Sequence, residues 1–166
     1  MTENKTIRNV FAWTLGGISA WLMVIFSAPY LKNLDLPLSA FLYSIFSPIC
    51  HQNPTRCFYL FGNPLAVCTR CLGIYFGFFL GTLLFPLING LTTVKPPEKL
   101  LFVILSIPIA TDTLANLFSL WHTSDWLRAV IGLIWGWILP YYFIAGVSEM
   151  FLEHKHFSLK KEQKTK

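Results

Sequence analysis

The sequence predicts an all-α membrane protein, a bundle of four transmembrane helices with an additional short half-helix. Of its 166 residues, 54% are apolar and only 13% are charged, and the mean hydropathy is +0.54. A water-soluble domain carries about twice that share of charged residues, so a solvent other than water must cover this surface. The apolar residues also form long blocks, with most charges between the blocks and at the chain ends, as in membrane-spanning chains.

Four apolar blocks are long enough to cross the hydrocarbon core of a bilayer, which requires about 20 helical residues. The predicted spans cover residues 10–30, 65–88, 100–120 and 126–147. The first span follows basic residues, as a signal peptide does, but its apolar run is long and no small-residue cleavage site follows, so we expect a retained anchor. Residues 36–50 form a shorter apolar stretch, which predicts an interfacial or re-entrant half-helix.

The charges predict the orientation of these spans. Residues 1–150 are expected to form a single transmembrane domain, followed by a basic tail over residues 151–166. Four spans place both chain ends on one side of the membrane. That side carries Lys5, Arg8, Lys95, Lys99, Lys155, Lys160, Lys161, Lys164 and Lys166, and the other side carries only Lys32, Arg56, Arg70 and Arg128. By the positive-inside rule, both termini are expected to be cytoplasmic, in the cell membrane.

Charge and small residues also indicate the partners of the chain. The lysine-rich tail accounts for the net charge of +5. Such a run fits anionic lipid headgroups better than a nucleic-acid groove, so we expect the lipid bilayer and not nucleic acid as the partner. Gly73, Gly77 and Gly81 recur at every fourth position, which predicts close helix packing within the chain or between copies in a homo-oligomer.

All four cysteines fall within 22 residues of the extracytoplasmic part of the chain, at positions 50, 57, 68 and 71. Cys68 and Cys71 are three residues apart at the opening of a helix, so both sulfurs share one face near unpaired backbone N–H groups. The positive end of the helix dipole and the neighbouring Arg70 favour thiolate over thiol. The cluster is therefore the strongest functional feature of the sequence.

One interpretation of the cluster is a metal site. Three thiolates and one imidazole are a donor set typical of zinc or another thiophilic transition metal. They would come from Cys50, His51, Cys68 and Cys71. The adjacent residues Cys50 and His51 reach one ion only if the backbone bends, and Pro48 and Pro54 could provide that bend. Cys57 is left over and remains free to pair.

The alternatives to a metal site use the same sulfurs. Cys68 and Cys71 could cycle between dithiol and disulfide and pass electrons to a quinone in the bilayer. A four-helix membrane protein with this motif resembles, in architecture alone, the disulfide-generating quinone reductases and the vitamin K epoxide reductase class. One or two structural disulfides would be ordinary in an oxidising compartment. The Cys-x-x-Cys spacing by itself does not separate these interpretations.

A carboxylate within the third predicted span requires a partner. Inserting the charged side chain of Asp112 near the centre of a bilayer would cost about 2.5–3.5 kcal/mol of free energy. Asn116 lies one helical turn away on the same face, and Arg70 or Arg128 could reach Asp112 from the extracytoplasmic side. With Arg56, these residues are expected to form a polar pocket around the cysteine site. Asp112 also permits a third function, a small transporter, although four short helices leave little room for alternating access.

Two sequence blocks match the signature of a known family. The first is Cys50-His51-Gln52 with Arg56 and the run CTRCLGIYFG that begins at Cys68, and the second is Asp112 followed by Arg128 and a Gly-rich helix. Over about residues 45–140 the chain thus resembles a family of small prokaryotic membrane proteins, domain of unknown function 2085. The chain departs from the family pattern at Thr113, where Gly is expected, and at Cys57. The resemblance implies the membrane architecture and these site residues, and it implies no reaction.

Overall fold

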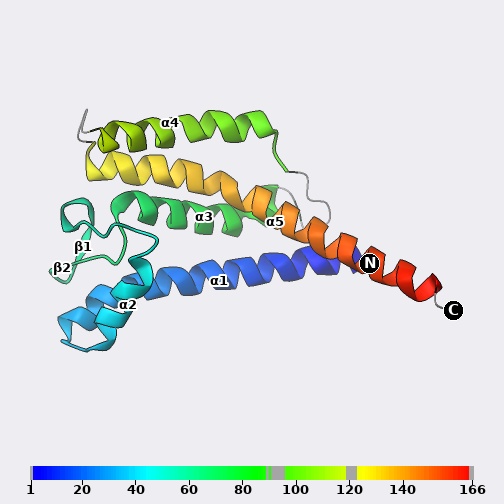
Figure 1. Ribbon diagram of the computed structural model, residues 1–166, viewed down its shortest axis with the longest axis horizontal. Coiled ribbons are helices and arrows are strands. Elements are labelled where there is room, and N and C mark those ends of the chain that lie inside the picture. Colours follow the sequence, from blue (N-terminus) through cyan, green and yellow to red (C-terminus); the bar gives the residue numbers. More distant parts are fainter. Residues whose placement is uncertain (1, 89, 91–95, 119–122, 165–166) are drawn as a thin grey trace.

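The computed structural model describes residues 2–88, 90, 96–118 and 123–164, and most of them are helical (Figure 1). Four helices are long and apolar enough to cross a membrane: α1 (Thr2–Asn33), α3 (Thr69–Ile88), α4 (Lys99–Leu117) and α5 (Asp125–Lys164). Between α1 and α3 lie α2 (Leu38–Phe46), the 3-10 turn η1 (Pro54–Arg56) and the short strands β1 (Tyr59–Leu60) and β2 (Asn63–Pro64). The predicted all-α membrane fold with four spans is confirmed.

Two helices extend beyond the apolar blocks from which they were predicted. Helix α1 begins at Thr2, ahead of the predicted span over residues 10–30, and α5 continues to Lys164, well past position 147. The predicted tail is thus a continuation of α5 as far as the structure describes it. The hydrocarbon thickness limits the length of the apolar block and not that of the helix, and the tail carries many good helix formers and neither Gly nor Pro.

The other elements are shorter than predicted. Helix α3 begins at Thr69 and not at position 65, and Leu65, Ala66 and Val67 are buried in the irregular segment that precedes the helix. Helix α2 ends at Phe46 and not at position 50, since Pro48 lacks an N–H donor and restricts the residue before it. Helix α4 ends at Leu117, and positions 119–120 of the predicted span, like Lys95, lie outside the described residues.

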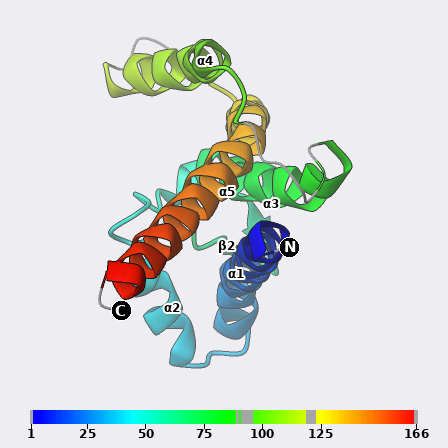
Figure 2. The same cartoon turned by 90° about the vertical axis from the view of Figure 1, so that its right-hand side faces the viewer.

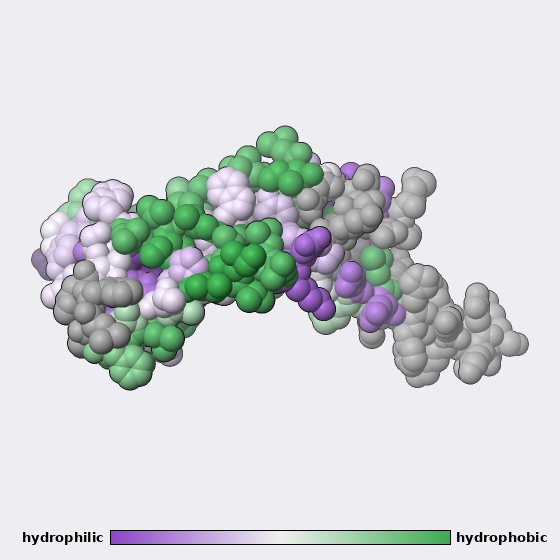
Figure 3. Space-filling model, turned by 90° about the horizontal axis from the view of Figure 1, so that it is seen from above, coloured by the Kyte–Doolittle hydropathy of each residue, from purple (hydrophilic) through white to green (hydrophobic). Residues whose placement is uncertain are grey.

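Helices α3 and α5 form the centre of the bundle, with α1 packed against both and α4 packed along α5 (Figures 1 and 2). Both ends of the chain lie at one end of the molecule, and α2 with the two strands lies at the opposite end (Figure 1). On the face seen from above, apolar residues cover the middle of the molecule, and hydrophilic residues gather beyond them toward the termini (Figure 3). This distribution matches a bundle whose middle faces lipid.

Glycines bring α3 and α5 into backbone contact. A Cβ atom added at Gly73 or Gly77 would overlap the backbone carbonyl of Ala129 or Leu133 on α5. The arrangement is reciprocal, because added Cβ atoms at Gly132 and Gly136 would overlap the carbonyl oxygens of Arg70 and Ile74 on α3. Small residues thus allow two membrane helices to approach more closely than larger side chains would.

Among the described residues, most of the buried apolar side chains belong to two clusters, one toward each end of the bundle. The cluster toward the termini comprises Val10, Phe85, Tyr141 and Ile144. The opposite cluster joins α1, α2 and the segment before α3, and comprises Leu22, Ile25, Ala28, Phe46, Cys50, Ala66 and Val67. Because Cys50 is itself a member, the cysteine region is anchored in packed core and not in a free loop.

The backbone contact yields a first prediction. Gly77→Ala forces a methyl group into the backbone of α5, so we expect the free energy of unfolding to fall by about 1–3 kcal/mol. The matched control is Gly16→Ala on α1, where an added Cβ meets nothing within 4 Å. That control should be neutral or stabilising by up to about 1 kcal/mol, because alanine is the better helix former. Thermal unfolding in detergent measures both, and equal melting temperatures would contradict the packing described.

Candidate functional site

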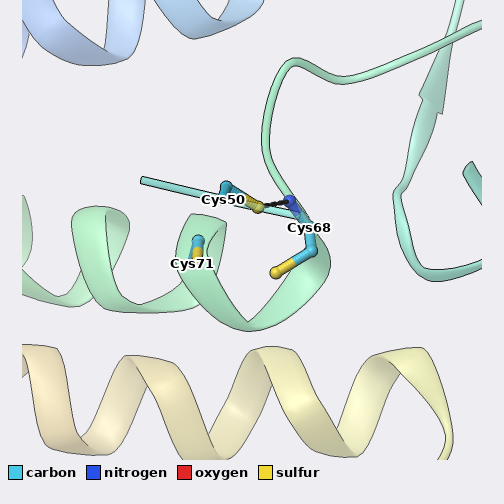
Figure 4. A group of neighbouring side chains, drawn as sticks. All are labelled: Cys50, Cys68 and Cys71. Carbon is cyan, nitrogen blue, oxygen red and sulfur yellow. Dashed lines mark hydrogen bonds between the residues drawn. The ribbon is translucent and has the colours of Figure 1, made fainter. Parts of the chain in front are cut away.

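Three of the four cysteines come together at the start of α3. The sulfur atoms of Cys50, Cys68 and Cys71 all lie within 4.8 Å of one another (Figure 4). Cys50 belongs to the turn after α2, Cys68 immediately precedes α3, and Cys71 lies in the first turn of that helix. The three sulfurs therefore form a compact group, called the sulfur cluster below.

Backbone and side-chain hydrogen bonds hold the two segments of the sulfur cluster together. The backbone N–H of Cys68 donates to the Cys50 sulfur over 3.1 Å, which Figure 4 shows as a dashed line. The amide nitrogen of the Gln52 side chain donates to the carbonyl oxygens of Tyr43 at 2.7 Å and Ala66 at 2.9 Å. Gln52 thus ties α2 to the segment that leads into α3.

The Gln52 backbone explains how the chain turns so sharply at the cluster. Its φ is 46°, in the left-handed region that few residues other than glycine adopt. Such a conformation costs free energy and persists where surrounding contacts enforce it, as the two Gln52 side-chain hydrogen bonds do here. Sequence reasoning assigned no function to Gln52, and its place in the Cys-His-Gln motif was the only available signal.

The sulfur cluster favours a thiolate at Cys50. Hydrogen bonds from the Cys68 and Cys71 thiols, and then from the backbone N–H groups of Cys68 and Gln52, hold the pKa of Cys50 far below its usual range, although burial opposes this. The same interaction raises the pKa of Cys68, which donates its proton to Cys50. Backbone N–H groups directed at a sulfur stabilise its anionic form, the form that binds metals and acts as a nucleophile.

His51 and Cys57 lie outside the sulfur cluster. His51 is exposed and is not among the described residues whose ligand atoms group with the three sulfurs. Its backbone neighbour Cys50 points into the core, and adjacent residues cannot both do so without a tighter bend. Cys57 is a free, buried thiol that donates to the carbonyl oxygen of Asn53 over 3.2 Å. Burial is the main cause that raises the Cys57 pKa to about 12, and the neighbouring sulfurs of Cys68 and Cys50 add to the shift when they are ionised.

Asp112 is the centre of a polar network beside the sulfur cluster. Its carboxylate forms an ion pair with Arg70 and accepts hydrogen bonds from the side chains of Asn116, at 3.0 Å, and Thr123. Arg128 donates to the Asn116 side-chain oxygen over 2.6 Å. Both arginines considered from the sequence therefore participate, Arg70 directly and Arg128 through Asn116.

The position of Asp112 along α4 differs from that of a carboxylate at the centre of a bilayer. Helix α4 ends at Leu117, so Asp112 lies about 7.5 Å from its end and close to the starts of α3 and α5. Only Asp112 and Ala115 are buried among the described residues of α4. Thr113 accepts a hydrogen bond from Arg70 over 3.1 Å. Thr113 and Thr123 are the members of this network that sequence reasoning missed.

A small cavity, lined mainly by polar and charged residues, joins the sulfur cluster to the Asp112 network. It measures about 130 Å³. Its lining consists of His51, Asn53, Arg56, Cys68, Thr69, Arg70 and Arg128. The residues predicted to surround the cysteines are thus distributed over two neighbouring features: Arg56 lines the cavity, Asp112 and Asn116 form the network, and Arg70 and Arg128 belong to both.

The chain is similar to a family of predicted membrane proteins and to uncharacterised archaeal proteins. A family model described as "Predicted membrane protein (DUF2085)" matches residues 50–142, a range that begins at the first cysteine and includes the Asp112 network. An uncharacterised protein of Methanocaldococcus jannaschii is 38% identical over 132 residues, which cover 76% of this chain and 85% of that relative. An uncharacterised protein of Methanothermobacter thermautotrophicus is 36% identical over 91 residues, or 53% of this chain and 78% of that relative. No solved structure matches.

The Asp112 network yields a prediction about stability. Asp112→Asn leaves Arg70 without its carboxylate partner, so we expect the free energy of unfolding to fall by about 3–5 kcal/mol. Asp125→Asn is the matched control, because Asp125 lies 3.6 Å from Arg128 and its side chain is 38% exposed. Its loss should cost at most about 1 kcal/mol. Unfolding curves of the two variants in detergent measure both changes. A larger loss of unfolding free energy in Asp125→Asn than in Asp112→Asn would contradict the network.

The high pKa of Cys57 yields a prediction about reactivity. At pH 8 a thiol with a pKa of about 12 is present as thiolate in a fraction of only about 10⁻⁴ of the molecules. Since the thiolate is the reactive form, iodoacetamide should alkylate Cys57 about a thousandfold more slowly than an ordinary free cysteine. Peptide mass spectrometry of the folded protein gives this rate, and denatured protein is the control. Rapid alkylation of Cys57 in the folded protein would show that the thiol is neither buried nor surrounded by negative charge.

Proposed function

Since this chain belongs to the DUF2085 family of predicted membrane proteins, we propose that it is a multi-pass protein that binds a thiophilic metal ion at its extracytoplasmic side. The ligands are the sulfurs of Cys50, Cys68 and Cys71. The observation that carries this proposal is the mutual approach of the three sulfurs to within 4.8 Å.

The spacing of the sulfurs suits a tetrahedral ion. Zn²⁺ binds thiolates at about 2.3 Å, which places two ligand sulfurs about 3.8 Å apart in a tetrahedral site. The sulfur cluster would need only a modest contraction from its upper limit of 4.8 Å. Soft thiolates select zinc and other thiophilic metals over magnesium or calcium, so the donor set argues for this class.

Three thiolates leave the fourth tetrahedral position to a ligand from outside the cluster. His51, the predicted fourth ligand, is exposed and stands apart from the sulfurs. Closed sites with four protein ligands are typically structural, whereas a site with three protein ligands holds a water or a substrate in the remaining position. We therefore favour an open centre that binds a small molecule on the metal.

The surrounding charges suit such a centre. Three thiolates and a divalent metal carry one net negative charge. The three arginines of the cavity exceed the two carboxylates beside them, Asp112 and Asp125, by one positive charge. Positive charge beside the sulfurs lowers the electrostatic cost of holding a negatively charged centre next to a membrane.

The orientation is part of the proposal. Both ends of the chain lie at the end of the molecule opposite the sulfur cluster (Figure 1). Most lysines and arginines also belong to the side of the termini, as the sequence predicts. The positive-inside rule then places the termini in the cytoplasm of the cell and the sulfur cluster on the outer side of the cell membrane.

Metal content tests the proposal. Protein purified in a maltoside detergent under reducing conditions should contain about one equivalent of zinc, iron, copper or nickel by plasma mass spectrometry, or take up one equivalent of Zn²⁺. Cys71→Ser should lose the metal, and the matched control Cys57→Ser should retain it. His51→Ala should also retain it if three thiolates suffice. Protein that contains no metal and binds none when reduced excludes the centre.

A thiol oxidoreductase that reduces a quinone is the second candidate, and an apolar groove favours it. The groove lies between α1, α3 and α5, and its lining includes Trp13, Trp21, Tyr75 and Phe78. Trp21 and Tyr75 also pack against the core cluster that contains Cys50. A lipid-soluble quinone in this groove would thus approach the sulfurs from within the bilayer.

The redox step of this candidate needs no reactant besides the quinone. The thiols of Cys68 and Cys71 lose two electrons and two protons and form one S–S bond. The quinone takes up the two electrons and the two protons and becomes the quinol. Reduced protein should then convert a short-chain quinone to quinol, followed by absorbance, and Cys71→Ser should not. If the cysteines stay reduced in the presence of excess quinone, this candidate is wrong.

A further inference from the structure

Three residues that line the small cavity between the sulfur cluster and the Asp112 network have buried polar atoms without partners. Thr69 Oγ1, Arg70 Nε and Arg128 Nε are buried and have no hydrogen-bond partner among the described residues. All three residues line the cavity. Thr69 is 0% exposed and Arg128 is 5% exposed. Buried polar groups are normally paired, so three unpaired donors around one small space point to a ligand that accepts hydrogen bonds.

The cavity also contains positive charge that no protein carboxylate balances. Arg70 pairs with Asp112, and Arg128 lies 3.6 Å from Asp125. Arg56, in contrast, has no ion pair and no side-chain hydrogen bond within the described part of the chain. The cavity further adjoins the start of α3, where the helix dipole adds positive potential. Its ligand should therefore be an anion.

Size and donor geometry narrow the class of anion. At about 130 Å³ the cavity is smaller than the 300–1,000 Å³ typical of drug-sized ligands. Guanidinium groups and a hydroxyl are the donors with which proteins bind phosphate-like oxyanions. We propose that this cavity binds a tetrahedral oxyanion of the phosphate class, either free or as the headgroup phosphate of a lipid, held by Arg56, Thr69, Arg70 and Arg128.

This proposal does not depend on a metal in the sulfur cluster. The anion would be held by guanidinium and hydroxyl groups, and Cys68 is the only residue that belongs to both the cavity and the sulfur cluster among the described residues. Because Cys68 is shared, a phosphate group bound in the cavity would place the rest of its molecule next to the three sulfurs. The cavity would then be an anchoring site for a phosphorylated molecule or a phospholipid.

Calorimetric titration distinguishes the two sources of phosphate. Delipidated protein in a maltoside detergent, which contains no phosphate, is titrated with inorganic phosphate in one arm and with a short-chain phosphatidic acid in the other. Saturable binding of inorganic phosphate supports a free oxyanion, and saturation by the lipid alone supports a headgroup. If neither saturates by about 10 mM, the proposal is overturned.

Variants show whether the binding occurs in the cavity. Arg56→Gln should weaken binding about tenfold or more without altering the fold, because its guanidinium has no partner within the described chain. Arg8→Gln removes the same charge from an exposed position on α1 and is the matched control, for which we expect unchanged affinity. Equal affinities in the two variants would show that binding is general attraction to a basic protein, and would overturn the proposal.

A second variant separates ligand binding from structure. Thr69→Val keeps the shape of the side chain and removes a hydroxyl that has no partner, so the melting temperature should not fall while the affinity for the anion does. Repeating the titration after treatment with a chelator should leave the affinity unchanged. Affinity that disappears with the chelator would mean that the anion binds a metal and not the cavity, and the proposal would then be wrong.

Discussion

The backbone contact between α3 and α5 is the constraint on which the rest of the structure depends. Water contributes no hydrophobic effect between helices in lipid, so this contact relies on dispersion forces between closely packed backbones. Gly132 on α5 packs against the backbone of Arg70, which lies in the first turn of α3 between Cys68, just before the helix, and Cys71. The start of α3, with its cysteines, is thereby fixed beside the start of α5, with Arg128. A larger residue at a glycine would separate the two halves of the candidate site.

The Asp112 network holds α4 in a different way. Helix α4 buries only Asp112 and Ala115 among its described residues, and Phe102 adds ring contacts with Trp135 and Tyr142 of α5. Polar contacts hold it as well: Arg70 pairs with Asp112, and the Trp135 side chain donates to Ser106 over 2.9 Å. Away from water such bonds have few competitors, and their geometry fixes a helix that is otherwise surrounded by lipid. The same network orients Arg70 and Arg128, so the attachment of α4 and the electrostatics of the cavity share one cause.

The candidate site combines two neighbouring features of opposite charge. The sulfur cluster stabilises a thiolate at Cys50 through hydrogen bonds, and the cavity beside it is lined by three arginines. Cys68 belongs to both. A soft nucleophilic or metal-binding group next to an anion-binding space is an arrangement that positions a charged molecule against reactive sulfur. Metal binding, quinone reduction and anion binding are separate proposals for one location, and each depends on the position of the α3 start.

The sequence by itself determined the class of the protein, and it supplied the candidate site residues that the structure then arranges. A bilayer imposes length and apolarity on every span, so each span is recognisable in its own stretch of sequence. Helix ends were less predictable: the apolar run that begins at Leu65 is helical only from Thr69, since apolarity alone does not distinguish a helix from a buried irregular segment. Only the tertiary structure decided which of the candidate ligands meet. Gln52 turns the chain so that Cys50 reaches Cys68 while His51 faces outward, and that choice depends on hydrogen bonds to Tyr43 and Ala66, contacts between distant residues that no local pattern encodes.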